Sequence, residues 1–334
     1  MKKERVEKWD NLKFILIYLV VLGHLVDPFT GTRLCMQKIF SWIYAFHMPA
    51  FIFVTGMLGK RNVQEKRYPQ IASYLVMYIA TQMISCLSGF IGTGEVKFEL
   101  FKSMIFPWYA FAVFVYYLVT IAVRRLKKRY VFLFAVVLAC FAGYDSSLGD
   151  FLFLSRLVVF YPFFYAGYCM QPERLWEIAG RKNIRVLSAT VFAVFTGCVL
   201  LFHDKLYRYR GMLTGRNSFE IVLKTDYAYA GWIRLIYYIL AFVLAFALIS
   251  LTPNRRTAFT WIGKNTLSVY MLHYFFIDLL DGRIQMAAVT QDISGGILVP
   301  SLVVLALLIT FICGNPLFEK LCRKFVMVTE HIES

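Results

Sequence analysis

Long apolar runs, separated by short charged or turn-forming segments, fill most of the chain. A helix that crosses a bilayer needs about 20 largely apolar residues, and an open sheet in lipid leaves backbone groups unpaired. We therefore expect an all-α polytopic membrane protein with about ten transmembrane helices. The apolar runs lie at residues 12–28, 37–58, 69–92, 100–122, 130–145, 151–171, 184–203, 229–251, 259–281 and 296–319. The fifth run is the shortest, which leaves open a re-entrant segment in place of a full crossing.

The composition agrees with this pattern and excludes a soluble enzyme. Of the 334 residues, 59% are hydrophobic and only 17% are charged, with a mean hydropathy of +0.61. A soluble domain carries roughly a quarter of charged residues. The predicted helices use nearly the whole length, so we expect a single membrane-embedded domain, residues 1–334, whose chemistry lies among the helices.

The net charge is +16, from 36 basic and 20 acidic residues, and the positions of the basic residues indicate an orientation in the membrane. With the N-terminus inside, 23 of the 36 Lys and Arg residues fall on the inner side and 10 on the outer side. Because basic residues gather in cytoplasmic loops, this predicts a multi-pass protein of the cell membrane with both termini cytoplasmic, and gives no reason to invoke nucleic acid. The outer loop 204–228 departs from the rule with five basic residues. That loop either serves a ligand or is less constrained because it is long.

The first apolar run contains the most informative polar residues. His24 lies eleven residues after Lys13, which puts both on one helix face about 16 Å apart. Asp27, three residues beyond His24, is placed to reach the imidazole. An aspartate beside a histidine fixes its tautomer and raises its basicity, as a general base requires. The alternative is a structural histidine bonded to a carbonyl of another helix.

Two further histidines lie inside apolar runs. His47 precedes Pro49, which is expected to kink the helix and leave a carbonyl free; His47 either takes part in the chemistry or satisfies that carbonyl. In the ninth run, Asn265 or Thr266 is expected to cap the helix that carries His273. No HxxxH pair and no CxxC pair among the seven cysteines occurs, so we expect neither a metal site nor a disulfide framework.

Arg156 and Arg234 lie near the outer ends of the sixth and eighth runs. A guanidinium binds anions and hydroxyl oxygens through a planar set of donors. The alternative is that these side chains extend to the membrane interface, which Trp232 and Tyr237 favour for Arg234 because aromatic residues gather there.

Five segments carry a set of residues in a fixed order: RVEKWDNLKFILIYLVVLGH, AFHMPAFIFVTGML, PWYAFAVFVYYLV, RLVVFYPFFYAGYCM and WIGKNTLSVYMLH. In the first, a basic residue, ten intervening positions and a histidine follow one another, at Lys13 and His24. Together the segments resemble the integral-membrane acyltransferase family 3, in its fucose 4-O-acetylase-like branch. The matching positions in the later segments are His47, Met48, Pro49, Gly56, Trp108, Arg156, Pro162, Phe163, Phe164, Gly167, Gly263, Asn265, Thr266, Tyr270 and His273. Thr55 stands where many relatives have serine.

The resemblance implies an O-acetyltransferase that takes an acyl group, usually acetyl, from cytoplasmic acyl-CoA and delivers it to a hydroxyl of a sugar or cell-surface glycan. Acyl-CoA is then a co-substrate, and no bound cofactor is expected. The expected partners are the bilayer, acyl-CoA and the glycan acceptor. His24 is expected to act as general base or transient acyl acceptor; the role of Asp27 rests on spacing alone. His47 is the third candidate catalytic residue.

Two groups of residues complete the expected site. The CoA phosphates should dock on a basic collar at the inner surface, formed by Lys13, Lys60, Arg61 and Lys264. The acceptor, or the cavity that receives it, is expected to contact Arg156, Arg234, Asn265, Tyr270 and His273.

Two other functions use the same polar residues without this chemistry. One is a transporter or flippase for a glycan or small anion, and the other is a membrane sensor or scaffold. Transporters often contain interrupted helices at corresponding places in two halves, and the sequence shows no such correspondence.

Overall fold

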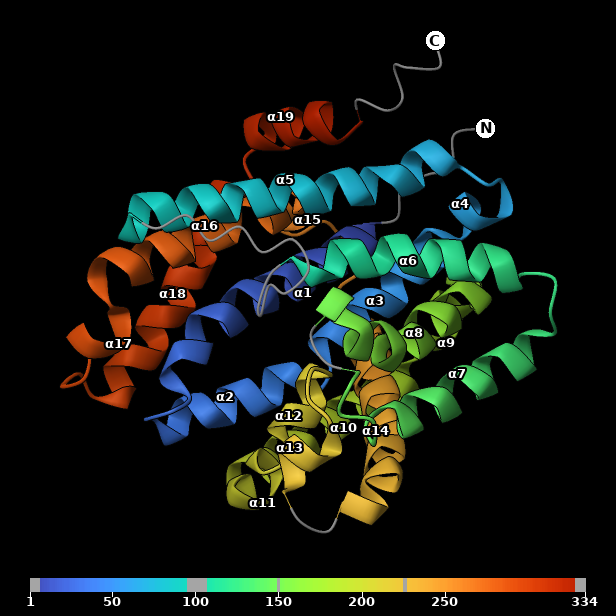
Figure 1. Cartoon of the computed structure of the whole chain (residues 1–334), viewed down its shortest axis with the longest axis horizontal. Coiled ribbons are helices and arrows are strands. Elements are labelled where there is room, and N and C mark those ends of the chain that lie inside the picture. The colour runs from blue at the N-terminus through green and yellow to red at the C-terminus, as the bar shows by residue number, and fades with distance from the viewer. Residues whose placement is uncertain (1–6, 95–106, 149–150, 225–226, 328–334) are drawn as a thin grey trace.

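The computed structural model describes residues 7–94, 107–148, 151–224 and 227–327, and every regular element within them is helical (Figure 1). This confirms the predicted all-α class. Six helical segments in the described residues are long and apolar enough to cross a bilayer: Glu7–Phe29, Leu34–Leu58, Tyr68–Gly92, Lys182–Leu201, Tyr227–Leu251 and Gly295–Cys313.

The other four predicted runs also contain helices, which are shorter or interrupted. The fourth, fifth and sixth runs form α6 (Trp108–Val123), α7 (Lys128–Ala142) and α8 (Leu154–Cys169). Residues 100–106 of the fourth run lie outside the described residues. The ninth run divides into α15 (Thr260–Lys264) and α16 (Thr266–Ile284). Ten crossings therefore stay a prediction, whereas helices at the predicted positions are a finding.

The second predicted span consists of two helices, α2 (Leu34–Tyr44) and α3 (His47–Leu58), with a break just before Pro49. Proline has no N–H for the preceding turn, so a helix interrupted at this place is expected. The His47 Nδ1–H donates to the Ile43 carbonyl oxygen over 2.9 Å. The imidazole therefore satisfies a backbone group at the kink, and the predicted kink is confirmed.

Helix α1 (Glu7–Val26) lies in the middle of the bundle, in contact with α2, α3, α15, α16 and α18 (Gly295–Cys313) (Figure 1). Residues from distant parts of the chain contact its first turns. The Asn11 amide donates to the carbonyl oxygens of Pro253 (3.0 Å) and Arg255 (2.9 Å). A side chain at Gly263 would collide with the Asp10 carbonyl oxygen. Such a close approach needs glycine, and it fixes α15 against the start of α1.

The most extensive contact between two helices in the described residues joins α3 and α8. A side chain at Gly56 would collide with the Phe164 carbonyl oxygen, and one at Gly167 with that of Phe53. Small residues let membrane helices approach backbone to backbone. This reciprocal glycine contact gives α3 and α8, which carry His47 and Arg156, a fixed relation.

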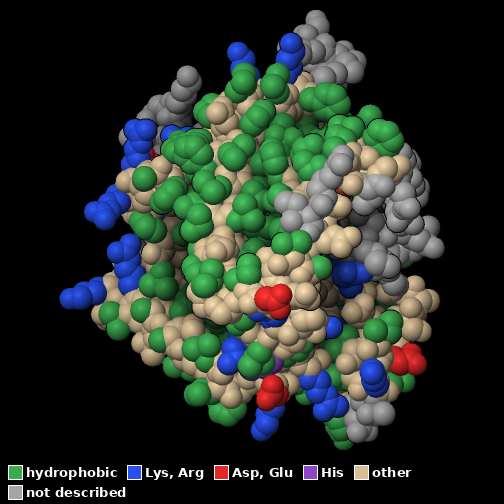
Figure 2. Space-filling view, turned by 90° about the vertical axis from the view of Figure 1, so that its left-hand side faces the viewer, with side chains coloured by type: hydrophobic (Ala, Val, Ile, Leu, Met, Phe, Trp, Pro, Cys, Tyr) green, Lys and Arg blue, Asp and Glu red, His purple; other side chains and the backbone are tan. Residues whose placement is uncertain are grey.

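Longer helices surround this centre: α5 (Tyr68–Thr93), α10 (Lys182–Leu201) and α14 (Ala230–Leu251). The sequence analysis missed several shorter helices: α4 (Lys60–Gln64), α9 (Pro172–Ala179), α11 (His203–Tyr207), α12 (Arg210–Thr214), α13 (Phe219–Leu223), α17 (Met286–Val289) and α19 (Pro316–Val326). The tenth run thus ends as a helix at Cys313, before α19 begins. Figure 2 shows one face of the bundle, with hydrophobic side chains over its upper and central part and charged ones mostly along its lower part and left edge.

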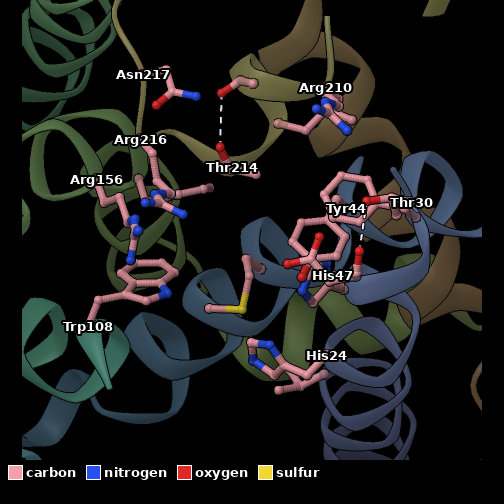
Figure 3. A pocket seen from close by; sticks show the side chains of 17 residues that line it. His24, Thr30, Tyr44, His47, Trp108, Arg156, Arg210, Thr214, Arg216 and Asn217 are labelled. Carbon is pink, nitrogen blue, oxygen red and sulfur yellow. Dashed lines mark hydrogen bonds between the residues drawn. The ribbon is translucent and has the colours of Figure 1, made fainter. Parts of the chain in front are cut away.

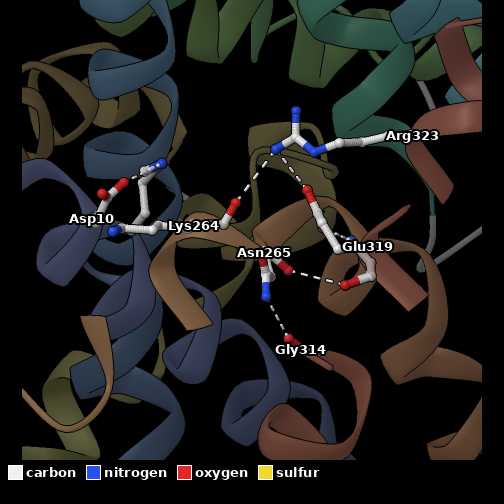
Figure 4. A network of polar contacts seen from close by, with 8 residues as sticks. Asp10, Lys264, Asn265, Gly314, Glu319 and Arg323 are labelled. Carbon is white, nitrogen blue, oxygen red and sulfur yellow. Dashed lines mark hydrogen bonds and ion pairs between the residues drawn. The ribbon is translucent and has the colours of Figure 1, made fainter. Parts of the chain in front are cut away.

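The start of α16 is capped by another helix, not by its own first residues. Asn265 occupies the cap position without a side-chain cap bond, and its amide donates to the Gly314 carbonyl oxygen over 2.9 Å (Figure 4). The Ser268 N–H donates instead to Glu319 Oε2 of α19 over 2.9 Å. A carboxylate at a helix N-terminus is stabilising. The predicted cap by Asn265 or Thr266 is therefore wrong, because a residue about fifty positions away supplies it.

Candidate active site

One face of α1, continued by the 3-10 turn Asp27–Phe29, carries a line of residues that all border cavities. Lys13, Ile17, Val20, His24 and Asp27 follow one another at spacings of four, three, four and three, which keeps them on one side of a helix. Lys13 borders a first cavity. Ile17, Val20 and His24 border a second, narrower cavity. Val20 and His24 also border a third cavity, together with Asp27. The cavities therefore succeed one another along α1.

The cavity at the C-terminal end of α1, which we call the arginine cavity, has a volume of about 270 Å³. Figure 3 shows His24 at the bottom of this view, below Tyr44 and His47, with Arg156 and Arg216 across from them. The polar residues in its wall are His24, Asp27, Thr30, Tyr44, His47, Arg156, Arg210, Thr214, Arg216 and Asn217. They come from α1, from the turn at residues 27–30 that follows it, from both halves of the broken second span, from α8 and from the segment 210–217. The cavity therefore brings distant parts of the chain around one imidazole.

A small cavity of about 30 Å³, which we call the neck, continues from His24 along α1. This is room for about one water molecule. Val20, His24, Met48 and Trp108 border both the neck and the arginine cavity, and Tyr270 borders the neck. The neck therefore begins at the imidazole itself.

Beyond the neck lies the lysine cavity, of about 300 Å³. Phe51 and Tyr109 border both the neck and the lysine cavity. Lys13 lies in its wall, with its ammonium 2.9 Å from Asp10 Oδ1. The Thr55 hydroxyl, also in the wall, is 2.7 Å from the Tyr109 hydroxyl. The structure thus brings Lys13 and His24 to opposite sides of the neck.

The imidazole of His24 packs against a second histidine. The His273 ring is stacked on it at a centroid distance of 5.5 Å, and Tyr274 meets it edge-on at 5.5 Å. His273 is fully buried, and its Nδ1–H donates to the carbonyl oxygens of Val269 and Tyr270. These bonds fix the orientation of the His273 ring against which the His24 imidazole is stacked.

Asp27 lies in the wall of the arginine cavity, as His24 does. Arg210 and Arg216 border the same cavity. These arginines belong to the segment 204–228, which sequence analysis marked for its excess of basic residues. The pairing of Asp27 with the His24 imidazole stays a prediction from spacing.

The other three residues of the predicted basic collar lie outside the wall of the lysine cavity. Lys60 and Arg61 lie on α4 outside the wall of the lysine cavity, although Gly59 and Asn62 beside them border it. Arg61 hydrogen-bonds Glu65 at 2.5 Å, and the hydrogen bonds from Arg61 and Arg67 hold the pKa of the Glu65 carboxyl below its usual range. The Arg61 side chain is therefore bound to a carboxylate of the same loop.

Lys264 is located on α15, which packs against α1 near Asp10 (Figure 4). Its carbonyl oxygen accepts a 3.4 Å hydrogen bond from Arg323 Nη2, and Arg323 also forms an ion pair with Glu319 at 2.6 Å. Lys264 thus stands at the same end of α1 as Lys13, outside the wall of the lysine cavity.

Two of the predicted acceptor residues, Arg234 and Asn265, form contacts between helices outside the wall of the arginine cavity. Arg234 is fully buried, with its guanidinium 4.5 Å from the centre of the Phe219 ring and its Nη1 donating to the Ala139 carbonyl oxygen. It lies outside the wall of the arginine cavity, and its full burial contradicts the expected extension to the membrane interface. Its contact with the acceptor stays a prediction. Asn265 holds the Gly314 carbonyl, as described above.

Sequence analysis did not name Tyr44, Arg210 or Arg216 as candidates, although all three border the arginine cavity. No periodicity marks them, because two belong to a loop that folds back over the helices. The one signal was the unusual charge of 204–228. Arg156, by contrast, is placed in the cavity wall, with its guanidinium 5.3 Å from the Trp108 ring.

Comparison with known proteins identifies the family to which the chain belongs. Residues 6–315 match the model of a family described as an acyltransferase domain. A curated relative, the nodulation protein NolL of Mesorhizobium japonicum, is 26% identical over 226 residues, which cover 61% of this chain and 58% of that protein. The chain thus matches less than two thirds of that relative's length. No solved structure matches the chain.

Proposed function

Because this chain belongs to the acyltransferase domain family, we propose that it moves an acyl group, in the first place acetyl, from cytoplasmic acyl-CoA to a hydroxyl of an extracytoplasmic or lipid-linked sugar. One observation carries the proposal: His24 stands where the neck meets the arginine cavity, with Lys13 in the cavity beyond the neck. An imidazole between two polar chambers suits a reaction whose substrates arrive from opposite sides.

The donor enters through the lysine cavity. Its phosphates bind the ammonium of Lys13 by charge-assisted hydrogen bonds, with Lys264 on the adjacent helix. The pantetheine arm spans the distance of about 16 Å from Lys13 to His24 along the helix. The neck has to widen for this, and the unbranched side chain of Met48 in its wall can change rotamer to allow it.

The acceptor hydroxyl enters through the arginine cavity and meets His24. Its proton passes to the imidazole while its oxygen attacks the thioester carbonyl carbon. The tetrahedral intermediate collapses with cleavage of the carbon–sulfur bond, and the imidazolium returns the proton to the departing CoA thiolate. The alternative, in which His24 first takes the acyl group itself, uses the same position. His47, fixed by its bond to Ile43, and Asp27 orient the acceptor.

The reaction is tested with membranes that contain the protein, labelled acetyl-CoA and a surface polysaccharide fraction. We expect label on the polysaccharide that is released by mild base, as an O-ester is. Uptake of glycan or anion across the membrane with no label transfer would indicate a transporter and overturn the proposal.

Replacing Lys13 with alanine is expected to raise the KM for acetyl-CoA about tenfold or more, because a charge-assisted hydrogen bond to phosphate contributes roughly 1.5–3 kcal/mol. The saturated rate should change much less. Steady-state kinetics at varied acetyl-CoA give both values. Lys182→Ala, at the exposed start of α10, is the matched control. An unchanged KM in Lys13→Ala would remove Lys13 from the donor site.

The orientation with both termini cytoplasmic predicts where single cysteines react. Gln64→Cys on α4 should be labelled by an impermeant maleimide only from the cytoplasmic side, and Leu148→Cys only from the outside. The signal of the unsubstituted protein, which has seven cysteines, is subtracted. Labelling of each cysteine from the opposite side would contradict entry of acyl-CoA into the lysine cavity from the cytoplasm.

A further inference from the structure

Helix α19 follows one membrane helix and is tied to the start of another. The membrane-length helix α18 ends at Cys313, and α19 begins three residues later. The Ser268 N–H at the start of α16 donates to Glu319 of α19, and Arg323 of α19 donates to the Lys264 carbonyl oxygen. Figure 1 shows α19 at the edge of the bundle, alongside α5. A helix joined to the ends of two membrane helices lies where hydrocarbon meets water.

The apolar side of α19 faces in two directions. Leu317, Leu321 and Phe325, spaced four residues apart, form one strip along the helix, and each is more than half exposed. Cys322 and Val326 form a second strip, which is buried against the bundle. The exposed strip, which we call the outer strip, therefore has no cover from the described part of the chain.

Positive charge lies beside the outer strip. Lys320 and Lys324 each follow a leucine of the strip by three positions, so they are its neighbours on the helix surface. Both lysines are exposed. The one carboxylate of α19, Glu319, forms an ion pair with Arg323 at 2.6 Å. The two lysines therefore give the outer strip a positive border.

An apolar groove of about 590 Å³ opens between α19, α5 and α16, and we call it the α19 groove. Its wall includes Met83 of α5, Met271 of α16 and Phe325 of α19, and the one charged residue among those that line it is Lys324. Met271 lies five residues into α16, about 8 Å from its start by helix rise. Such a depth is typical of contact with lipid chains just below the headgroups.

We propose that the α19 groove binds an anionic phospholipid, with its phosphate at Lys320 and Lys324 and an acyl chain along Met83 and Met271. Lysines beside an apolar helix surface attract anionic lipids. A zwitterionic lipid brings its own cation and gains less from the same two ammonium groups. This lipid site goes beyond the proposed acyl transfer and does not depend on it.

Native mass spectrometry of the full-length protein, released from detergent with equal amounts of two lipids, tests the headgroup preference. The probes are dioleoylphosphatidylglycerol and dioleoylphosphatidylcholine, which have the same acyl chains. Two lysines, at roughly fivefold in affinity each, predict that the first bound lipid is phosphatidylglycerol by about twenty-fivefold. Equal retention of the two lipids, or retention of neither, overturns the proposal.

A charge variant locates this preference on α19. The double substitution Lys320→Gln and Lys324→Gln should remove most of it, because the phosphate loses both ammonium groups. Lys127→Gln with Lys128→Gln is the matched control, since these lysines are exposed at the start of α7 and away from the groove. An equal loss in the control would show attraction to the net charge of the protein and contradict the site.

A second pair of variants tests the groove itself. Met83→Trp should lower the affinity for phosphatidylglycerol at least about tenfold, because the indole takes the place of the acyl chain and each buried CH₂ contributes roughly fourfold. Leu87→Trp, one turn further along α5, is the control, because Leu87 is also more than half exposed but does not line the groove. Equal affinities in the two variants would mean that the chain binds elsewhere and would refute the proposal.

Discussion

Replacing His24 with glutamine is expected to lower the rate of acyl transfer by about 10²–10⁴-fold, the usual contribution of a positioned general base. Glutamine keeps a polar side chain at the meeting point of the neck and the arginine cavity but cannot take a proton. The KM for acetyl-CoA should change little, because Lys13 and the lysine cavity are untouched. Initial rates with labelled acetyl-CoA at saturating donor and acceptor measure the effect.

A second histidine provides the matched control for this substitution. His203 is buried on α11, next to Asp204, and lies outside the cavity walls. His203→Gln should retain most of the activity at an equal amount of protein in the membrane. If His24→Gln keeps more than about a tenth of the rate, its imidazole is not the base.

Closing the neck should be nearly as damaging as removing the base. Val20 borders both the neck and the arginine cavity, and phenylalanine at this place fills a space that holds about one water. Val20→Phe is expected to lower transfer at least about a hundredfold, because the thioester no longer reaches His24 and small misplacements of reacting groups are this costly. Binding of acetyl-CoA in the lysine cavity should persist.

Two measurements separate a blocked neck from a damaged fold. Val20→Ala, which widens the neck, should keep transfer within a few-fold of the original rate. The Val20→Phe protein should elute as the same species in detergent and bind labelled CoA with unchanged affinity. Normal transfer through the phenylalanine-filled neck would mean that the donor approaches His24 by another route.

The apolar pattern predicted the positions of the helices well, because length and hydrophobicity decide which segments enter lipid. It was less informative where polar or special residues interrupt a run. The break before Pro49 and a helix start at Asn265 or Thr266 were expected, whereas the short helix α15 and the separate helix α19 were not. These depend on contacts between distant segments, such as the bond from Ser268 to Glu319.

The candidate site likewise contains residues that local spacing could place and residues that it could not. The spacing of Lys13 and His24 was sufficient to place both on one face of α1, because helix geometry is local. Arg234 looked like an interfacial residue by its neighbours but is buried under Phe219. Arg210 and Arg216 reach the cavity only because their loop folds back over α8, which no local pattern specifies.

The account depends on donor and acceptor meeting at His24 from opposite sides of the membrane, and sidedness tests this most directly. Right-side-out vesicles are loaded with labelled acetyl-CoA, and the sugar acceptor is supplied outside only. The account predicts labelled acceptor in the outer medium, with little or none from His24→Gln vesicles. Transfer that occurs only when acetyl-CoA and acceptor share one compartment would contradict it.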